Sequence, residues 1–312
     1  MKRMFALVMA MVMTLALVAC GGGEKLTFTT GGESGTYYGF GTVLAGQISD
    51  KTDTTVTAIV GAGSKGNIEA MDVGDAQLGF VQSDVMAYAY NGTSLFESKI
   101  DSFSTVASLY MEQVQIVTLD PTIKSVADLK GKTVSVGESG SGVYFNAIDV
   151  LAAYDLTLDD INPTYQSFGD STEALQDGKI DAGFIVSGAP TTAITSLATN
   201  RDVYLVELDD EHIEKLVAAS PYYSKNVIPA AAYGLDNDAT TVAVGAVVIA
   251  NDDVKEDDIY NVCAGIFNNI DALAHDKKNE LSLDFATSVT AVPYHKGAAK
   301  YFSEQGYTVP TK

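Results

Sequence analysis

The sequence predicts an α/β protein of two lobes with a ligand cleft between them, and three observations support this. The chain has 312 residues, of which 46% are apolar, and its mean hydropathy is +0.11. Such a chain forms a hydrophobic core but is long for a single one. The tetrapeptide Gly-Glu-Ser-Gly of residues 32–35 recurs at residues 137–140. In both copies a strand-like run precedes it and a helix-like apolar periodicity follows, as an α/β lobe requires.

The repeat extends beyond the tetrapeptide. Residues 69–81 align with residues 173–185, sharing two Gly, a Phe, a Glu and an Ala. Each copy therefore predicts a strand-loop-helix-strand-loop-helix-strand unit with parallel strands. The apolar runs Val114–Leu119 and Thr241–Ile249 predict two strands that cross between the lobes. We expect lobe I to comprise 25–113 and lobe II 114–240, with 241–312 forming the hinge return and the second part of lobe I.

The N-terminus predicts export. Residues 1–19 have a Lys-Arg pair followed by the apolar run Met4–Ala19, which is typical of a signal peptide. A transmembrane anchor is the alternative, but 16 apolar residues are fewer than the roughly 20 needed to span a bilayer. The letters LVAC ending at Cys20 are similar to a bacterial lipobox, which implies cleavage before Cys20 and its lipidation. Plain secretion with an incidental Cys is the alternative. With residues 20–24 as lipidated Cys and linker, we expect an extracytoplasmic protein anchored to the membrane by lipid.

The charge balance restricts the partners. The chain has 40 acidic and 19 basic residues, a net charge of −21. Removal of the signal peptide takes away Lys2 and Arg3, which changes the charge to −23 and leaves Arg201 as the only arginine. Nucleic acid is excluded as a partner because phosphate neutralisation needs clustered Lys and Arg. Arg201 lies in a polar turn and is expected to be a solvated charge. Arginine usually binds a carboxylate through two parallel hydrogen bonds, so here backbone N–H groups and hydroxyls must bind any ligand carboxylate instead.

Catalytic, cofactor and metal sites are not predicted. Cys263 lies in a helical apolar stripe over 259–273 and is expected to be a buried core thiol. Residues 62–66, Ala-Gly-Ser-Lys-Gly, resemble a nucleophile elbow, but no triad partners support a hydrolase. The Gly-Lys-Thr of 131–133 is interpreted as a turn rather than a phosphate loop. No metal site is expected because the histidines are far apart: His212, His275 and His295.

An ordered set of motifs identifies a family resemblance. Several segments of the chain, taken in order, support this resemblance. They are TGGESGTYY, IVGAGSKGNIEAM, GFVQSDV with AYNGT, SVADLKGKTVSVGESGSG, EALQDGKIDAGFIVSGAP and IPAAAY. Together they resemble the TAXI-type solute-binding proteins of TRAP transporters. The resemblance covers the chain from about residue 25 to the C-terminus. It implies a type II-like periplasmic-binding-protein fold with two hinge-crossing strands. It also implies capture of a small organic solute and delivery to a TRAP membrane permease driven by an ion gradient.

The resemblance further implies glutamate, glutamine, small dicarboxylates or oxo-acids such as 2-oxoglutarate as solutes. The alternative function is a ligand-sensing lipoprotein that uses the same clamshell to report to a membrane signalling partner.

Loops between strands and helices are the candidate binding elements, because helix N-termini present free N–H groups to anions. In lobe I we expect ligand contacts from Gly32, Ser34, Thr36, Tyr37, Tyr38, Ser64, Lys65, Asn67, Gln82, Ser83 and Tyr88. The alternative for the first loop is a glycine turn with Ser34 capping a helix. Asp84 is expected to be an N-cap, and Lys65 is the cation that would assist with a second carboxylate.

Lobe II is expected to supply the matching contacts Ser139, Ser141, Asn146, Ser187, Gly188 and Pro190. Tyr222 or Tyr223 would form a wall near residues 227–230, although core packing is the alternative. A monocarboxylate or a zwitterionic amino acid suits such loops better than a phosphate, which usually recruits Lys or Arg.

Overall fold

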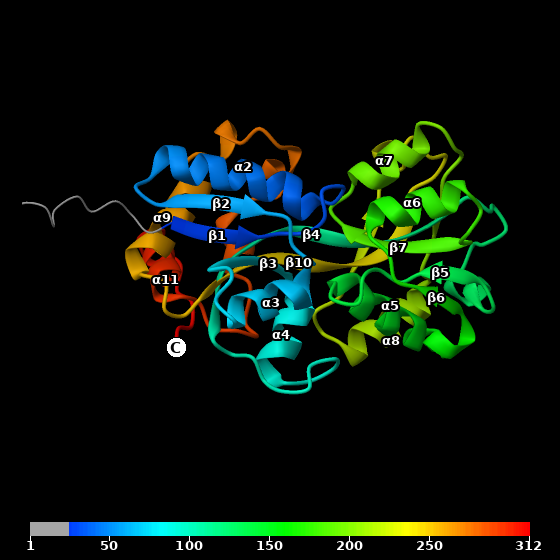
Figure 1. Ribbon diagram of the computed structural model, residues 1–312, viewed down its shortest axis with the longest axis horizontal. Helices are drawn as coiled ribbons and strands as arrows, with labels where there is room; N and C mark the ends of the chain where they lie inside the picture. Colours follow the sequence, from blue (N-terminus) through cyan, green and yellow to red (C-terminus); the bar gives the residue numbers. More distant parts are fainter. Residues whose placement is uncertain (1–24) are drawn as a thin grey trace, which may run out of the picture.

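The computed structural model describes residues 25–312, so the predicted signal peptide, Cys20 and linker lie outside the described residues. In lobe I, drawn at the left of Figure 1, three parallel strands form the order β2-β1-β3. They are β1 (Lys25–Thr29), β2 (Thr55–Ile59) and β3 (Leu78–Gln82), and the helices that follow them are α2 (Thr36–Lys51), α3 (Ser64–Asp72) and α4 (Ser83–Asn91).

Lobe II repeats this arrangement. Its parallel strands have the order β6-β5-β7. They are β5 (Thr133–Ser135), β6 (Asn162–Thr164) and β7 (Ala182–Ser187), followed by α5 (Gly142–Ala153), α6 (Phe168–Gln176) and α7 (Thr192–Ala198). The two lobes therefore share strand order and direction, which is the structural form of the sequence repeat.

Two long antiparallel strands join the lobes. They are β4 (Phe103–Thr118) and β10 (Ala239–Asn251), and the sheet runs β3-β10-β4-β7 through them. Figure 1 shows both strands passing from one lobe to the other. The short strands β8 (Tyr204–Val206) and β9 (Ser224–Ile228) pair with β4 and β10, and α8 (Asp210–Ala219) lies between them in the chain. β4 is longer than the predicted run, because its first half is already a buried strand of lobe I.

The C-terminal helices return to lobe I. They are α9 (Glu256–Phe267), α10 (Leu283–Ala286) and α11 (Lys296–Glu304). The stripe predicted as one helix to Leu273 is wrong at its end, since α9 stops at Phe267 and a separate turn follows. Cys263 is buried and free, as expected. The remaining turns are 3₁₀ helices: η1 (Val126–Leu129), η2 (Leu158–Asp160), η3 (Ala230–Ala232), η4 (Ile270–Ala272) and η5 (Asp276–Glu280).

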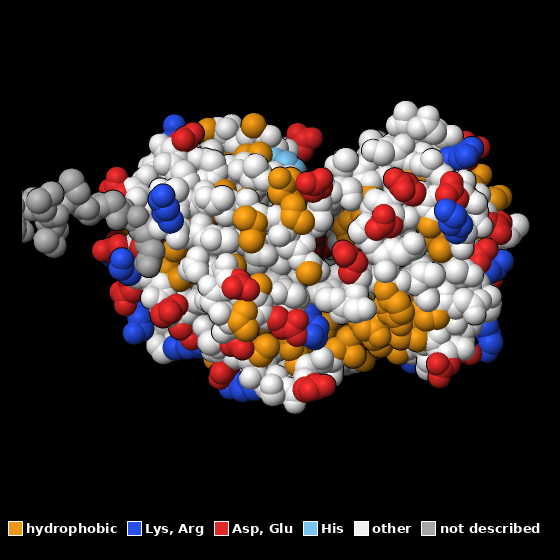
Figure 2. Space-filling view, viewed as in Figure 1, with side chains coloured by type: hydrophobic (Ala, Val, Ile, Leu, Met, Phe, Trp, Pro, Cys, Tyr) orange, Lys and Arg blue, Asp and Glu red, His pale blue; other side chains and the backbone are white. Residues whose placement is uncertain are grey.

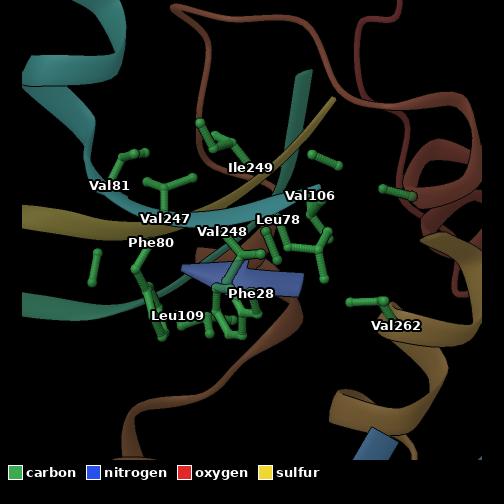
Figure 3. Close-up of a cluster of buried hydrophobic side chains, with 14 of the residues drawn as sticks. Phe28, Leu78, Phe80, Val81, Val106, Leu109, Val247, Val248, Ile249 and Val262 are labelled. Atoms are coloured by element: carbon green, nitrogen blue, oxygen red, sulfur yellow. The ribbon is translucent and has the colours of Figure 1, made fainter. Parts of the chain in front are cut away.

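Each lobe has its own hydrophobic core, and the crossing strands contribute to both. The lobe I core packs Phe28 against Phe80, with ring centroids 5.0 Å apart, and includes Val247 and Val248 of β10. Figure 3 shows these side chains around β1, β3 and β10. The lobe II core includes Val242, also from β10. Within residues 25–312, no helix has the length and apolar character needed to cross a membrane.

Candidate functional site: a cavity between the lobes

A small cavity lies where the strand-to-helix loops of the two lobes meet. Its volume is about 60 Å³, several times the space that one water molecule needs. Figure 2 shows a notch between the lobes on this side of the molecule, with acidic side chains on both rims. The lining residues are Gly31, Gly32, Ser34, Gly35, Thr36, Tyr37, Ala62, Gly63, Ser64, Gln82, Glu112, Glu138, Ser141, Gly142, Val143, Gln166, Ser167, Phe168, Val186 and Ser187.

Four helices begin at the cavity. The N-cap residues of α2, α3, α5 and α6 are Gly35, Gly63, Ser141 and Ser167, and all four line it. Helix N-termini carry partial positive charge and unpaired N–H groups. The cavity is therefore a favourable place for an anionic group although no Lys or Arg is among its lining residues within 25–312.

Direct hydrogen bonds close the two lobes on each other. The Thr36 backbone N–H donates to Ser187 Oγ at 3.1 Å, and Thr36 Oγ1 donates to the Gly188 carbonyl at 3.2 Å. On the other side of the cavity the Gly66 N–H donates to the Gly140 carbonyl at 2.9 Å. The structure is thus the closed form of a clamshell, held by polar contacts at its rim.

Glycines let the lobes approach this closely. Gly63 has φ of +89°, and a Cβ there would lie 3.2 Å from the Ser141 Cα of the opposite lobe. A Cβ on Gly142 would lie 1.9 Å from Gln82 Oε1 and 2.8 Å from Ser64 Oγ. A side chain at residue 142 would therefore force Gln82 to move or the lobes to separate.

The cavity wall contains buried polar atoms without hydrogen-bond partners. They are Tyr37 Oη, Gln82 Oε1 and Glu112 Oε2. Glu112 lies in β4 and is 2% exposed. Burial is the main cause that raises the pKa of Glu112 to about 8. Unpaired buried polar groups are rare in native proteins, so this wall is a candidate surface for ligand contact.

A second buried polar cluster links the lobes beside the cavity. Asn146 Nδ2 of α5 donates to Asp84 Oδ2 of α4 at 2.9 Å and to Tyr223 Oη at 2.7 Å. Tyr223 Oη donates to Asp149 Oδ2 at 2.9 Å. Burial, followed by repulsion from Asp149, raises the pKa of Asp84 to about 7. Asp84 therefore contacts the other lobe, and its predicted N-cap role is wrong because Gln82 is the N-cap of α4.

Eight of the predicted binding residues line the cavity. They come from both lobes: Gly32, Ser34, Thr36, Tyr37, Ser64, Gln82, Ser141 and Ser187. The alternative in which Ser34 caps a helix is wrong, because Gly35 is the N-cap of α2 and no side chain caps it. Whether these eight residues contact a solute stays a prediction.

The other nine predicted residues do not line the cavity: Tyr38, Lys65, Asn67, Ser83, Tyr88, Ser139, Asn146, Gly188 and Pro190.

Their contacts explain why. The Lys65 ammonium forms an ion pair with Glu69 on its own helix. The Asn67 amide donates to the backbone carbonyls of Thr30 and Phe80, at 2.5 and 2.7 Å, and so fixes the strands behind the loop.

Two more of these nine residues have contacts elsewhere, and a third is exposed. Ser83 Oγ accepts from the Gly245 N–H at 3.0 Å, and Tyr88 Oη lies 2.9 Å from Ser220 Oγ. Ser139 is exposed.

The expected aromatic wall is also absent from the cavity lining of residues 25–312. Tyr223 is buried in the interlobe cluster, and the Tyr222 ring meets Tyr88 edge-on at 5.9 Å. Residues 227–230 lie at the end of β9 and in the following turn. Arg201 is exposed, as expected.

Sequence reasoning missed four lining residues with functional side chains: Glu112, Gln166, Ser167 and Phe168. Two signals could have found them. Residues 166–168 occupy the lobe II position that corresponds, in the repeat, to the loop before α3. Glu112 is the only acidic residue in the 16-residue strand β4, most of which is buried. A lone carboxylate in such a strand needs a specific partner.

Comparison with known proteins identifies the family. A model of the NMT1-like family matches residues 28–306. The chain belongs to the NMT1-like family. This match spans both lobes and the return to lobe I, so every element that forms the cavity lies within it.

Solved structures confirm the predicted two-lobed fold. MatC from Rhodopseudomonas palustris with bound malate is similar with a TM-score of 0.56 and 14% identity, over 82% of this chain and 86% of that one. A putative L-cystine ABC transporter protein from Listeria monocytogenes has a TM-score of 0.52 and 14% identity, over 86% of this chain and 99% of that one. An arginine-specific periplasmic binding protein from Salmonella typhimurium has a TM-score of 0.50 and 14% identity, over 85% of this chain and 100% of that one. At this identity the likeness concerns the fold alone.

Substitution of Gly142 tests the closed form. We expect Gly142→Ala to push Gln82 into the cavity or hold the lobes apart, because the new Cβ would overlap Gln82 Oε1. Small-angle X-ray scattering should then give a larger radius of gyration than wild type. Gly46→Ala in α2 is the control, since a Cβ there meets nothing within 4 Å. Identical scattering and ligand affinity for Gly142→Ala and wild type would show that this contact does not limit closure.

Proposed function

We propose that the protein is the extracytoplasmic solute-binding receptor of a TRAP-type transporter. In this role it captures a small organic acid or amino acid between its lobes and delivers it to a membrane permease driven by an ion gradient. The observation that carries the proposal is the closed cavity, lined by polar loops of both lobes and by four helix N-termini. The NMT1-like family and the shared fold support a receptor, and the sequence resemblance supports the TAXI subtype.

The cavity chemistry supports a small, weakly charged solute. The hydroxyls of Ser34 and Ser64 and the helix N-termini offer donors to a carboxylate. A phosphate usually recruits Lys or Arg, and neither is among the lining residues of the described chain. Binding without chemical conversion is the activity we propose. Glutamate, glutamine and 2-oxoglutarate are the first solutes to test.

A thermal-shift screen of these solutes, succinate, short fatty acids and sugars tests the receptor role. A solute at about one hundred times its Kd should stabilise the protein by about 2.7 kcal/mol. Ser34→Ala should weaken binding by about 0.5–1.5 kcal/mol, because it removes a donor from the cavity. Ser139→Ala is the matched control, since Ser139 is exposed and outside the lining. A panel without any shift, or equal loss in both variants, would contradict the assignment.

Reconstitution tests the transporter partner. With the permease in proteoliposomes, we expect uptake of the bound solute to need the receptor and an ion gradient and to proceed without ATP. Receptor carrying Gly142→Ala should support less uptake, because closure is impaired. Uptake that requires ATP would exclude a TRAP system, and a receptor that binds solute but supports no uptake would favour the sensing lipoprotein.

Cys20 is the proposed lipid attachment site. We expect Cys20→Ala to release the protein from membranes into the soluble fraction, because lipidation supplies the anchor. Mass spectrometry of the wild-type N-terminal peptide should show an acylated Cys20. Cys263→Ala is the control, since that thiol is buried and should not affect fractionation. Wild-type protein that begins at another residue or carries no lipid would point to plain secretion.

A further inference from the structure

The cavity contains one deeply buried carboxyl group, that of Glu112. Glu112 lies at the middle of β4, where the strand passes between the lobes, and it lines the cavity. Its side chain is 2% exposed, and Oε2 has no hydrogen-bond partner within residues 25–312. Removing a carboxyl from water without a partner is unfavourable. Such a group is best explained by a solute that supplies the missing contact.

The neighbouring groups do not neutralise Glu112. Lys277, whose charge acts on Glu112, does not line the cavity; its Nζ donates to the Ala189 carbonyl at 3.1 Å and pairs with Glu280. Tyr37 and Gln82 line the same cavity beside Glu112, and both are neutral side chains, so they offer it hydrogen bonds but no positive charge. The other charge among the lining residues of the described chain is negative, on Glu138 at the exposed edge.

Several ionisable groups act on Glu112 from the surrounding elements. They are Tyr37 of α2, Asp84 of α4, Tyr110 of β4 itself and Lys277 of η5, and Glu280 of η5 acts on Tyr110 and pairs with Lys277. Burial is the largest influence and raises the pKa of Glu112 to about 8, with Asp84 adding to the shift and Tyr37 and Lys277 opposing it. In the absence of a cationic ligand, the carboxyl therefore retains its proton at neutral pH.

We propose that Glu112 is the specificity-determining residue of the cavity and binds a protonated nitrogen of the solute, so that the cavity takes a small zwitterion or cation and rejects a dianion. The solute's carboxylate, where it has one, would lie at the helix N-termini capped by Gly35, Gly63, Ser141 and Ser167. This inference rests on the proposed receptor function and narrows its solute class.

Binding then releases a proton. A solute ammonium needs the Glu112 carboxylate, so the Glu112 proton leaves to solvent as the ion pair forms. Affinity should rise with pH by up to about tenfold per unit and level off above about pH 8. If instead protonated Glu112 donated to a solute carboxylate, affinity would be nearly level below about pH 8 and fall above it, so the slope between about pH 6 and about pH 8 separates the two roles.

Matched solute pairs test the proposal on the full chain. Isothermal titration calorimetry would compare glutamate with glutarate, alanine with propionate, and 4-aminobutyrate with butyrate, from about pH 6 to about pH 8. We expect the amine-bearing member of a pair to bind about 30-fold tighter or more, with affinity rising with pH. Equal or tighter binding of the amine-free member, or an affinity of the amine-bearing member that does not rise with pH, would overturn the inference and leave the receptor function standing. Failure of every solute in this and the wider screen would overturn both.

Glu112→Gln isolates the charge while keeping the side-chain volume. We expect this variant to lose about 30-fold or more in affinity for the amine-bearing solute and to lose the pH slope. Its melting temperature without ligand should not fall at neutral pH, because Glu112 is then already uncharged and the neutral amide has nearly the same size. Glu97→Gln is the control, since Glu97 is exposed and outside the cavity. Unchanged affinity and slope in folded Glu112→Gln would overturn the assignment, and the wild-type pH slope tests it without any variant.

Discussion

The antiparallel pair formed by β4 and β10 is the constraint on which the rest of the structure depends. Its ladder runs from Ala243 opposite Gln113 to Asn251 opposite Phe103, with irregularities in register beside Val247 and Val248. Beyond this ladder β4 pairs with β7 and β10 with β9, so each strand belongs to both lobes. Irregular register increases local twist and bending. The pair therefore both joins the lobes and sets the place where they meet.

The position of Glu112 along β4 explains why its carboxyl lies in the cavity. The flanking residues Met111 and Gln113 are only partly buried, whereas Glu112 between them is buried. Alternate residues of a strand point to opposite faces. Glu112 thus enters the interlobe space because of its register in β4, and its carboxyl reaches a place that no strand-to-helix loop provides.

Closure depends on polar contacts of modest strength. At the rim, Thr36 and Gly66 form a few hydrogen bonds with the other lobe, and each bond contributes a net of about 0.5–1.5 kcal/mol. A few such bonds stabilise the closed form by only a few kcal/mol. A solute that contacts both lobes can therefore change the balance between open and closed forms, which is what a receptor requires.

The sequence by itself determined the fold class and eight of the twenty residues that line the cavity. The repeated Gly-Glu-Ser-Gly and the alternation of strands and helices depend on local periodicity and turn chemistry, which a sequence carries directly. Only the tertiary structure decided which loop side chains reach the cavity: Ser34 lines it, whereas its repeat counterpart Ser139 is exposed and Ser141 lines it instead. It also decided the place of Glu112, because strand register and the meeting of two lobes depend on contacts between residues far apart in the chain.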